Sequence, residues 1–149
     1  MTMAPDALVE KFFGGTTPTS GGNAVSAAAG LALLDTIVDE GLIENAARMG
    51  RYFTEASWNL KDPWIGDVRF TGLLGGIELV RDIASKEILG KAEVSRIKDL
   101  LHEQGMLITV SGTHGNVLRL QPPLIVTAAQ IDQFLAVLAK VLPAVRKGK

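Results

Sequence analysis

The sequence predicts an α+β domain in which a mostly antiparallel sheet of three or four strands carries helices on one face. Stretches with helical and strand-like periodicity follow one another in the order helix, helix, strand, strand, helix, strand, strand, helix. Strand pairs separated by helices are typical of this class. The 149 residues are 47% hydrophobic and 21% charged, which is the composition of a chain that folds around a core.

The first predicted helix covers residues 24–38 and follows a polar leader, residues 1–23. The leader ends in the sequence TTPTSGGN at 16–23, where proline and glycine disfavour regular structure. Asn23 is a suitable N-cap for the helix. Because the helix is apolar nearly all round, we expect it to be long and buried. The remaining residues, 24–149, are predicted to form one domain.

A second helix is predicted after Gly41, since residues from Leu42 to Leu60 form a single apolar stripe at helical spacing. Asp62-Pro63 ends this helix, because proline cannot continue the hydrogen-bonded ladder. Strands are predicted at 65–70 and 73–80. Glu78 is the one charged residue in the second of these strands, and we interpret it as a structural hydrogen-bond partner.

The C-terminal half repeats this alternation. A helix is predicted at 91–104, ended by Gly105. Strands follow at 106–110 and 117–120 around a polar loop. The last helix begins with a capping box, Thr127 to Gln130.

Charge and cysteine content exclude several kinds of protein. Fifteen Lys and Arg residues against 16 Asp and Glu residues give a net charge of −1, which argues against binding nucleic acid or anionic lipid by bulk charge. Without cysteine the chain has no disulfide, thiolate nucleophile or Cys-type zinc site. His102 and His114 have no spacing that indicates a shared metal ion.

No targeting or membrane-spanning segment is predicted. Asp6 and Glu10 occupy the region where a secretory signal would carry positive charge and then an apolar run. The most apolar stretch, 24–34, is too short to cross a bilayer and is followed by Asp35. We therefore expect a cytoplasmic protein with no membrane partner.

Two features have chemical potential. Hydroxyls and backbone amides of the leader just before the first helix suit a phosphate, although a flexible leader is the alternative interpretation. Arg119 is predicted on the strand face opposite Leu118 and Leu120, with a stiff Pro122-Pro123 pair beyond it. Its guanidinium could bind a carboxylate through two parallel hydrogen bonds; the alternative is a solvated strand arginine.

Four stretches, in order, resemble the C-terminal part of class III aminotransferases. These are the pyridoxal-phosphate (PLP) enzymes that include the ornithine, 4-aminobutyrate and ω-amino acid:pyruvate transaminases. The stretches are TSGGNA at 19–24, GLIENA at 41–46, IGDVR at 65–69 with GLLGGIEL at 72–79, and NVLRLQPPLIVT at 116–127. Two positions depart from the family pattern: Ala24 replaces its usual proline, and Phe70 replaces the glycine after the arginine.

The resemblance implies the small C-terminal domain of a PLP-dependent transferase of fold type I. It implies that Thr19, with Ser20 and Gly21, binds the PLP phosphate across the interface of a homodimer. It implies that Arg119 binds the carboxylate of the amino or oxo acid substrate. The large domain, with the lysine that holds the cofactor covalently, corresponds to sequence upstream of residue 1, so no catalytic residue is assigned here.

The resulting hypothesis is a segment of an enzyme that transfers an amino group between an amino acid or amine and an oxo acid. On this hypothesis the chain is inactive alone. One alternative is a non-catalytic dimerisation or ligand-binding module that retains the fold. A second is a small hydrolase that uses Ser111 and His114, which are close in sequence.

Overall fold

The computed structural model describes residues 19–148. Most of the predicted leader, residues 1–18, therefore lies outside the described part. The chain divides into two compact units, Met1–Thr36 and Ile37–Lys149, and each is treated by itself below.

The second unit contains an antiparallel sheet. Its elements are α3 (Leu42–Asn59), β1 (Ile65–Thr71), β2 (Leu74–Asp82), β3 (Glu87–Ile88), α4 (Lys91–Glu103), β4 (Thr109–Ser111), β5 (Val117–Leu120) and α5 (Ala128–Arg146). The strands lie in the order β1-β2-β5-β4, with β3 paired to β2, and all pairings are antiparallel. The predicted α+β class is confirmed.

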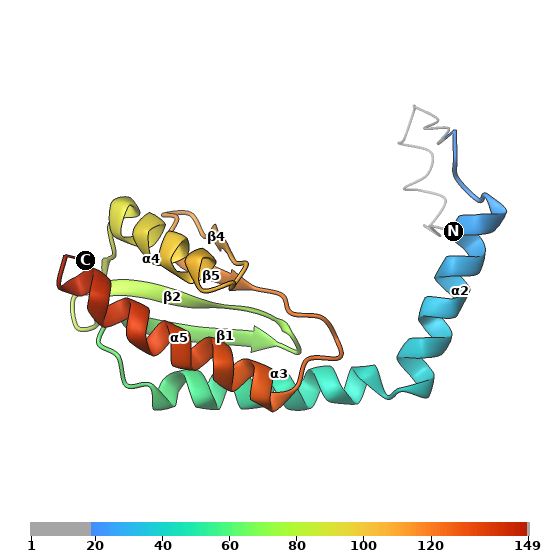
Figure 1. Cartoon of the computed structure of the whole chain (residues 1–149), viewed down its shortest axis with the longest axis horizontal. Coiled ribbons are helices and arrows are strands. Elements are labelled where there is room, and N and C mark those ends of the chain that lie inside the picture. Colours follow the sequence, from blue (N-terminus) through green and yellow to red (C-terminus); the bar gives the residue numbers. More distant parts are fainter. Residues whose placement is uncertain (1–18, 149) are drawn as a thin grey trace, which may run out of the picture. The chain divides into compact units, whose positions relative to one another are not determined.

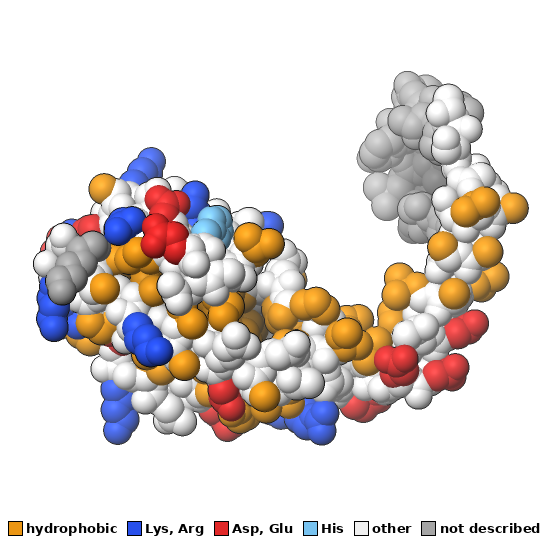
Figure 2. Space-filling view, viewed as in Figure 1, with side chains coloured by type: hydrophobic (Ala, Val, Ile, Leu, Met, Phe, Trp, Pro, Cys, Tyr) orange, Lys and Arg blue, Asp and Glu red, His pale blue; other side chains and the backbone are white. Residues whose placement is uncertain are grey.

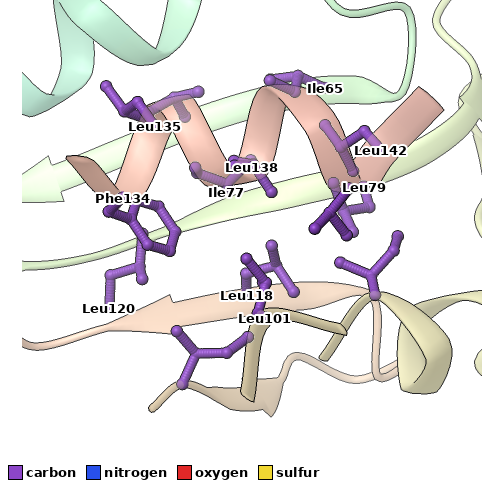
Figure 3. Packing of buried hydrophobic residues seen from close by; sticks show 14 of the residues in the cluster. Ile65, Ile77, Leu79, Leu101, Leu118, Leu120, Phe134, Leu135, Leu138 and Leu142 are labelled. Carbon is purple, nitrogen blue, oxygen red and sulfur yellow. The ribbon is translucent and has the colours of Figure 1, made fainter. Parts of the chain in front are cut away.

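The core lies between this sheet and the three helices α3, α4 and α5, which cover one of its faces (Figure 1). Side chains from β2, β5, α4 and α5 converge there (Figure 3). Six of the side chains labelled there are 0% exposed: Ile77, Leu79, Leu101, Leu118, Leu138 and Leu142. Burying a side chain of this size contributes about 1.5–3 kcal/mol. The helices therefore cover one face of the sheet. Side chains that point to the opposite face are not covered by these helices.

The sheet differs from the sequence prediction most clearly at two places. The sheet has a fifth strand, β3, whose two residues are too few to produce a periodic signal. β4 starts at Thr109 and not at Met106, because the Met106 amide donates back to the Leu101 carbonyl at 2.9 Å. Gly105 makes this return possible with a φ of 76°.

Phe70, which departs from the family pattern, has a packing partner on the core face. Its ring stacks on Phe53 with centroids 4.6 Å apart. Its cross-strand neighbour is Gly75, where an added Cβ would lie 2.3 Å from the Phe70 ring. The space left by one missing side chain is thus filled by the larger one opposite.

The helix α2 (Ala24–Asp39) forms over the predicted residues. Asn23 caps it, accepting a hydrogen bond from the Ser26 amide at 2.9 Å. The expectation that this helix is buried is wrong for this chain, since none of its residues is buried. Figure 2 shows the hydrophobic side chains along its surface. The sequence shows that this helix is apolar on nearly all sides and therefore needs a covering surface. That surface need not belong to the same 149 residues.

The exposed apolar surface of α2 leads to a prediction about association. Leu31, Leu34 and Val38 are 64%, 60% and 74% exposed and follow one another at helical spacing. Because water disfavours such a stripe, we expect the 149-residue chain to self-associate in sedimentation velocity experiments. Leu31→Glu combined with Leu34→Glu should reduce this association. A wild-type chain that stays monomeric at high concentration would contradict the prediction.

Within residues 19–148, one helix is long and apolar enough by length and composition to cross a membrane, namely α5. Seven of its residues are buried in the second unit: Ile131, Phe134, Leu135, Leu138, Val141, Leu142 and Val145. The predicted capping box at its start is present, with the Thr127 amide donating to Gln130 Oε1 at 3.0 Å. The apolar composition of α5 thus matches its position in the core.

Candidate functional site

Arg119 lies on the sheet face that points away from the helices. Its neighbours on β5, Leu118 and Leu120, are 0% and 6% exposed and belong to the core, whereas Arg119 is exposed. The alternation of a β-strand accounts for this arrangement. The sequence-based expectation for the direction of Arg119 is therefore met.

The strand register places Arg119 in a row across this outer face. Arg119 is opposite Gly76 on β2 and opposite Thr109 on β4. Gly76 is in turn opposite Arg69 on β1. The row therefore contains two arginines separated by a glycine, with a threonine at the end.

The two arginines differ in their charge environment. Arg69 donates to Glu78 Oε2 at 2.8 Å and also pairs with Asp67. The hydrogen bond to Glu78 is the main reason why the pKa of Arg69 is raised above its ordinary value. Glu78 has the structural role that the sequence indicated, and the positive charge of Arg69 is balanced within the sheet.

Arg119 has no such balance. Its Nε donates to the Thr109 hydroxyl at 3.1 Å, and among residues 37–148 no carboxylate forms an ion pair with it. Two Nη groups carry the remaining donors of the guanidinium. An external anion can therefore approach a cation whose charge the second unit does not compensate.

A cavity of about 280 Å³ lies beside Arg119. Its walls include the segment 105–108, the segment 119–123 and the aromatic rings of Phe53 and Phe134. Phe53, Leu120 and Phe134 in this lining are core residues, so these walls belong to the helix-covered side of the sheet, whereas the Arg119 side chain lies on the outer face.

The other predicted site residues, Thr19, Ser20 and Gly21, form a turn before α2 in the first unit. Asn23 Nδ2 donates to the Ser20 carbonyl at 2.8 Å and holds the turn against the helix start. Gly22 completes it with a φ of 75°, a conformation that glycine adopts without strain.

The donor set of this turn fits a phosphate group. Thr19 and Ser20 are exposed, and the first turn of α2 has no acidic residue. Hydroxyls and helix N-terminal amides favour an anion. These residues could therefore hold the phosphate of PLP.

The hydrolase alternative has no geometric support. Within residues 37–148 no hydrogen bond joins Ser111 to His114. His102 Nε2 lies 3.2 Å from the Ile108 carbonyl oxygen. Among the described residues there is also no group of three side chains that could hold a metal ion.

Sequence reasoning missed Thr109 and Gly76, the two residues beside Arg119. They lie 10 and 43 positions away from it in the chain, and no local periodicity reports such a distance. Only the strand register identifies them.

Comparisons of this chain with a family sequence model and with known proteins agree with each other. The sequence model of the family described as aminotransferase class-III matches residues 1–142. An isoleucine 2-epimerase of Lentilactobacillus buchneri is 42% identical over 133 residues, 88% of this chain and 29% of that protein. The mitochondrial alanine–glyoxylate aminotransferase 2 homolog 2 of Arabidopsis thaliana is 47% identical over 116 residues, 76% of this chain and 24% of that protein.

Solved structures agree with the sequence relatives. A transaminase from the marine bacterium Virgibacillus matches with a TM-score of 0.83 and 30% identity, and the match covers 92% of this chain and 32% of that chain. The chain therefore spans about a quarter to a third of the length of these relatives.

Proposed function

This chain belongs to the class-III aminotransferase family, as its motifs predicted, and we propose that it is the C-terminal part of a PLP-dependent transaminase. The complete enzyme would transfer an amino group between an amino acid or amine and an oxo acid. The observation that carries this proposal is Arg119, an exposed arginine on the outer sheet face without a carboxylate partner in the second unit.

Arg119 has the role of binding the substrate carboxylate. Two parallel hydrogen bonds from a guanidinium fix the orientation of a carboxylate as well as its position. The substrate carbon next to that carboxylate is thereby held in one place, which is how positioning accelerates a reaction. The segment Gln121-Pro122-Pro123 directly follows β5 and restricts backbone motion beside the arginine.

Thr19, Ser20 and Gly21 have the role of holding the cofactor phosphate. Their hydroxyls and amides donate, and the N-terminus of α2 adds a favourable dipole. PLP, when bound, would supply the electron sink for chemistry at the carbon that carries the amino group. The proposal includes a homodimer, because the family resemblance assigns Thr19 to the phosphate of the neighbouring subunit. It also includes a location in the cytoplasm, as expected from the sequence.

The phosphate role is tested with a complete enzyme, meaning this chain joined to an upstream domain of the class-III type. Thr19→Ala should weaken PLP retention by about tenfold, since a hydrogen bond to a charged group contributes about 1.5–3 kcal/mol. Cofactor absorbance after dialysis measures this retention. Thr36→Ala is the matched control, because the Thr36 hydroxyl donates within α2 to the Ala32 carbonyl. Equal retention by Thr19→Ala and wild type would remove Thr19 from the phosphate site.

A second reaction is favoured by the 42% identity to an isoleucine 2-epimerase. Epimerisation returns the proton to the other face of the same carbon and needs no oxo acid acceptor, whereas amino transfer does need one. The complete enzyme should therefore be incubated with an L-amino acid, with and without an oxo acid. Formation of a new amino acid that depends on the oxo acid supports transamination, and acceptor-independent appearance of the D-amino acid supports epimerisation.

A further inference from the structure

We propose that Thr109 is a positioning residue, which turns the guanidinium of Arg119 so that its two Nη groups meet a carboxylate end-on. This inference rests on the proposed function, because it states how the carboxylate-binding arginine is held. It assigns a role to a side chain on a different strand.

The first observation is the hydrogen bond itself. Arg119 Nε donates to Thr109 Oγ1 at 3.1 Å. A guanidinium can offer a carboxylate either the edge formed by Nε and one Nη or the end formed by both Nη groups. Because the threonine hydroxyl already accepts from Nε, the first edge is engaged. The end with the two Nη groups remains for the ligand.

The second observation is the register that holds the pair together. Thr109 is directly opposite Arg119, and the pairing of β4 with β5 continues through Val110 and Ser111. Threonine is β-branched, so its χ1 is restricted and its hydroxyl has few positions available. A stiff acceptor at a fixed register position gives the long arginine side chain a defined orientation.

The third observation is the absence of a side chain on the other side of Arg119. Gly76 is its neighbour on β2. A Cβ at Gly76 would lie 2.7 Å from Val117 Cγ1 and 3.0 Å from the Leu118 carbonyl oxygen, so the packing favours glycine here. Of the two cross-strand neighbours of Arg119, only Thr109 has a side chain that can orient the guanidinium.

These three observations predict the energetic consequence of removing the hydroxyl. An arginine that must lose its side-chain freedom when the ligand binds has a lower affinity than one already ordered. Thr109→Val keeps the shape of the side chain and removes the acceptor, and Thr109→Ser keeps the acceptor. We expect the valine variant to bind carboxylates about three- to tenfold more weakly.

The kinetic test uses the complete enzyme. Thr109→Val should raise the KM for an amino acid and for an oxo acid about three- to tenfold, with kcat and the cofactor absorbance unchanged. Thr109→Ser should restore the wild-type KM. The KM for an amine without a carboxylate should not respond to either change. In an Arg119→Gln background, Thr109→Val should have no further effect; an equal effect in both backgrounds would overturn the proposal in favour of a general role in β4.

A second readout is independent of activity and uses the 149-residue chain. The Arg119 Nε–Hε signal in a nitrogen–proton NMR spectrum is identified by its loss in Arg119→Gln. We expect this proton to exchange with water more slowly in the wild type and in Thr109→Ser than in Thr109→Val. Equal exchange in all three chains would overturn the proposal.

The two tests separate the possible failures. A raised KM in Arg119→Gln with no KM change in Thr109→Val would leave the proposed function intact and overturn the role of Thr109. An unchanged KM in Arg119→Gln would overturn the carboxylate-binding role of Arg119. The proposed orienting role of Thr109 would then be overturned as well.

Discussion

Replacing Arg119 by glutamine in a complete enzyme is expected to raise the KM for amino and oxo acids by about ten- to a hundredfold or more. A hydrogen bond to a charged group contributes about 1.5–3 kcal/mol, and a tenfold change in affinity corresponds to about 1.4 kcal/mol. Glutamine keeps a polar side chain but cannot form the two parallel bonds of a guanidinium. Lysine at this position should also fail to restore the wild-type KM, since its point charge lacks the fork geometry.

The same outer sheet face provides the matched control. Arg69 lies in the same row as Arg119, but Glu78 and Asp67 already pair with it. Exposed ion pairs of this kind contribute about 0–1 kcal/mol. Arg69→Gln should therefore leave the KM for carboxylate substrates within about twofold of wild type, because Asp67 and Glu78 already occupy both Nη groups of Arg69.

Two further readouts make the Arg119 result specific. Amines that lack a carboxylate should still react with Arg119→Gln, and PLP should remain bound, because the phosphate is assigned to Thr19. Steady-state kinetics with matched amino acid and amine donors measure the first, and cofactor absorbance measures the second. An unchanged KM for carboxylate substrates would make Arg119 a solvated strand arginine.

The 149-residue chain alone is expected to show no transamination. The family resemblance assigns the lysine that holds the cofactor covalently to a large upstream domain, and the chain spans 29% of the isoleucine 2-epimerase and 32% of the Virgibacillus transaminase. Without a lysine in that position, PLP can react only with surface lysines at random. Compared with a complete enzyme, we expect the chain to lose all transamination activity.

The assay combines the purified chain, PLP, an amino donor and either 2-oxoglutarate or pyruvate. Product formation is compared with PLP in buffer and with a complete enzyme under the same conditions. Turnover of the chain above the PLP blank would contradict the prediction. Denatured chain at the same concentration corrects for the slow reaction of PLP with exposed lysines.

Local sequence signals predicted most of the elements correctly. The capping residues Asn23 and Thr127 mark the helix starts that the structure has, because a cap acts on amides two or three residues away. Gly105 marks the end of α4 in the same way. Boundaries failed where the signal was short, as at β3, or where a turn competed with a strand, as at 106–108.

Burial of α2 could not be predicted from its own residues. A helix that is apolar nearly all round indicates a need for cover, but it does not indicate which residues supply that cover. In this chain none of its residues is buried. Burial depends on a second surface, and the periodicity of one segment carries no information about another.

The sequence by itself determined the α+β class, the family and the side of β5 on which Arg119 lies, because each depends on local periodicity or on a contiguous motif. The tertiary structure decided what surrounds Arg119. Strand register places Thr109 and Gly76 beside it, and it leaves the charge of Arg69, but not that of Arg119, balanced by carboxylates of the second unit. The physical reason is that side chains interact through space, and pairing of strands brings together residues that are tens of positions apart in the chain.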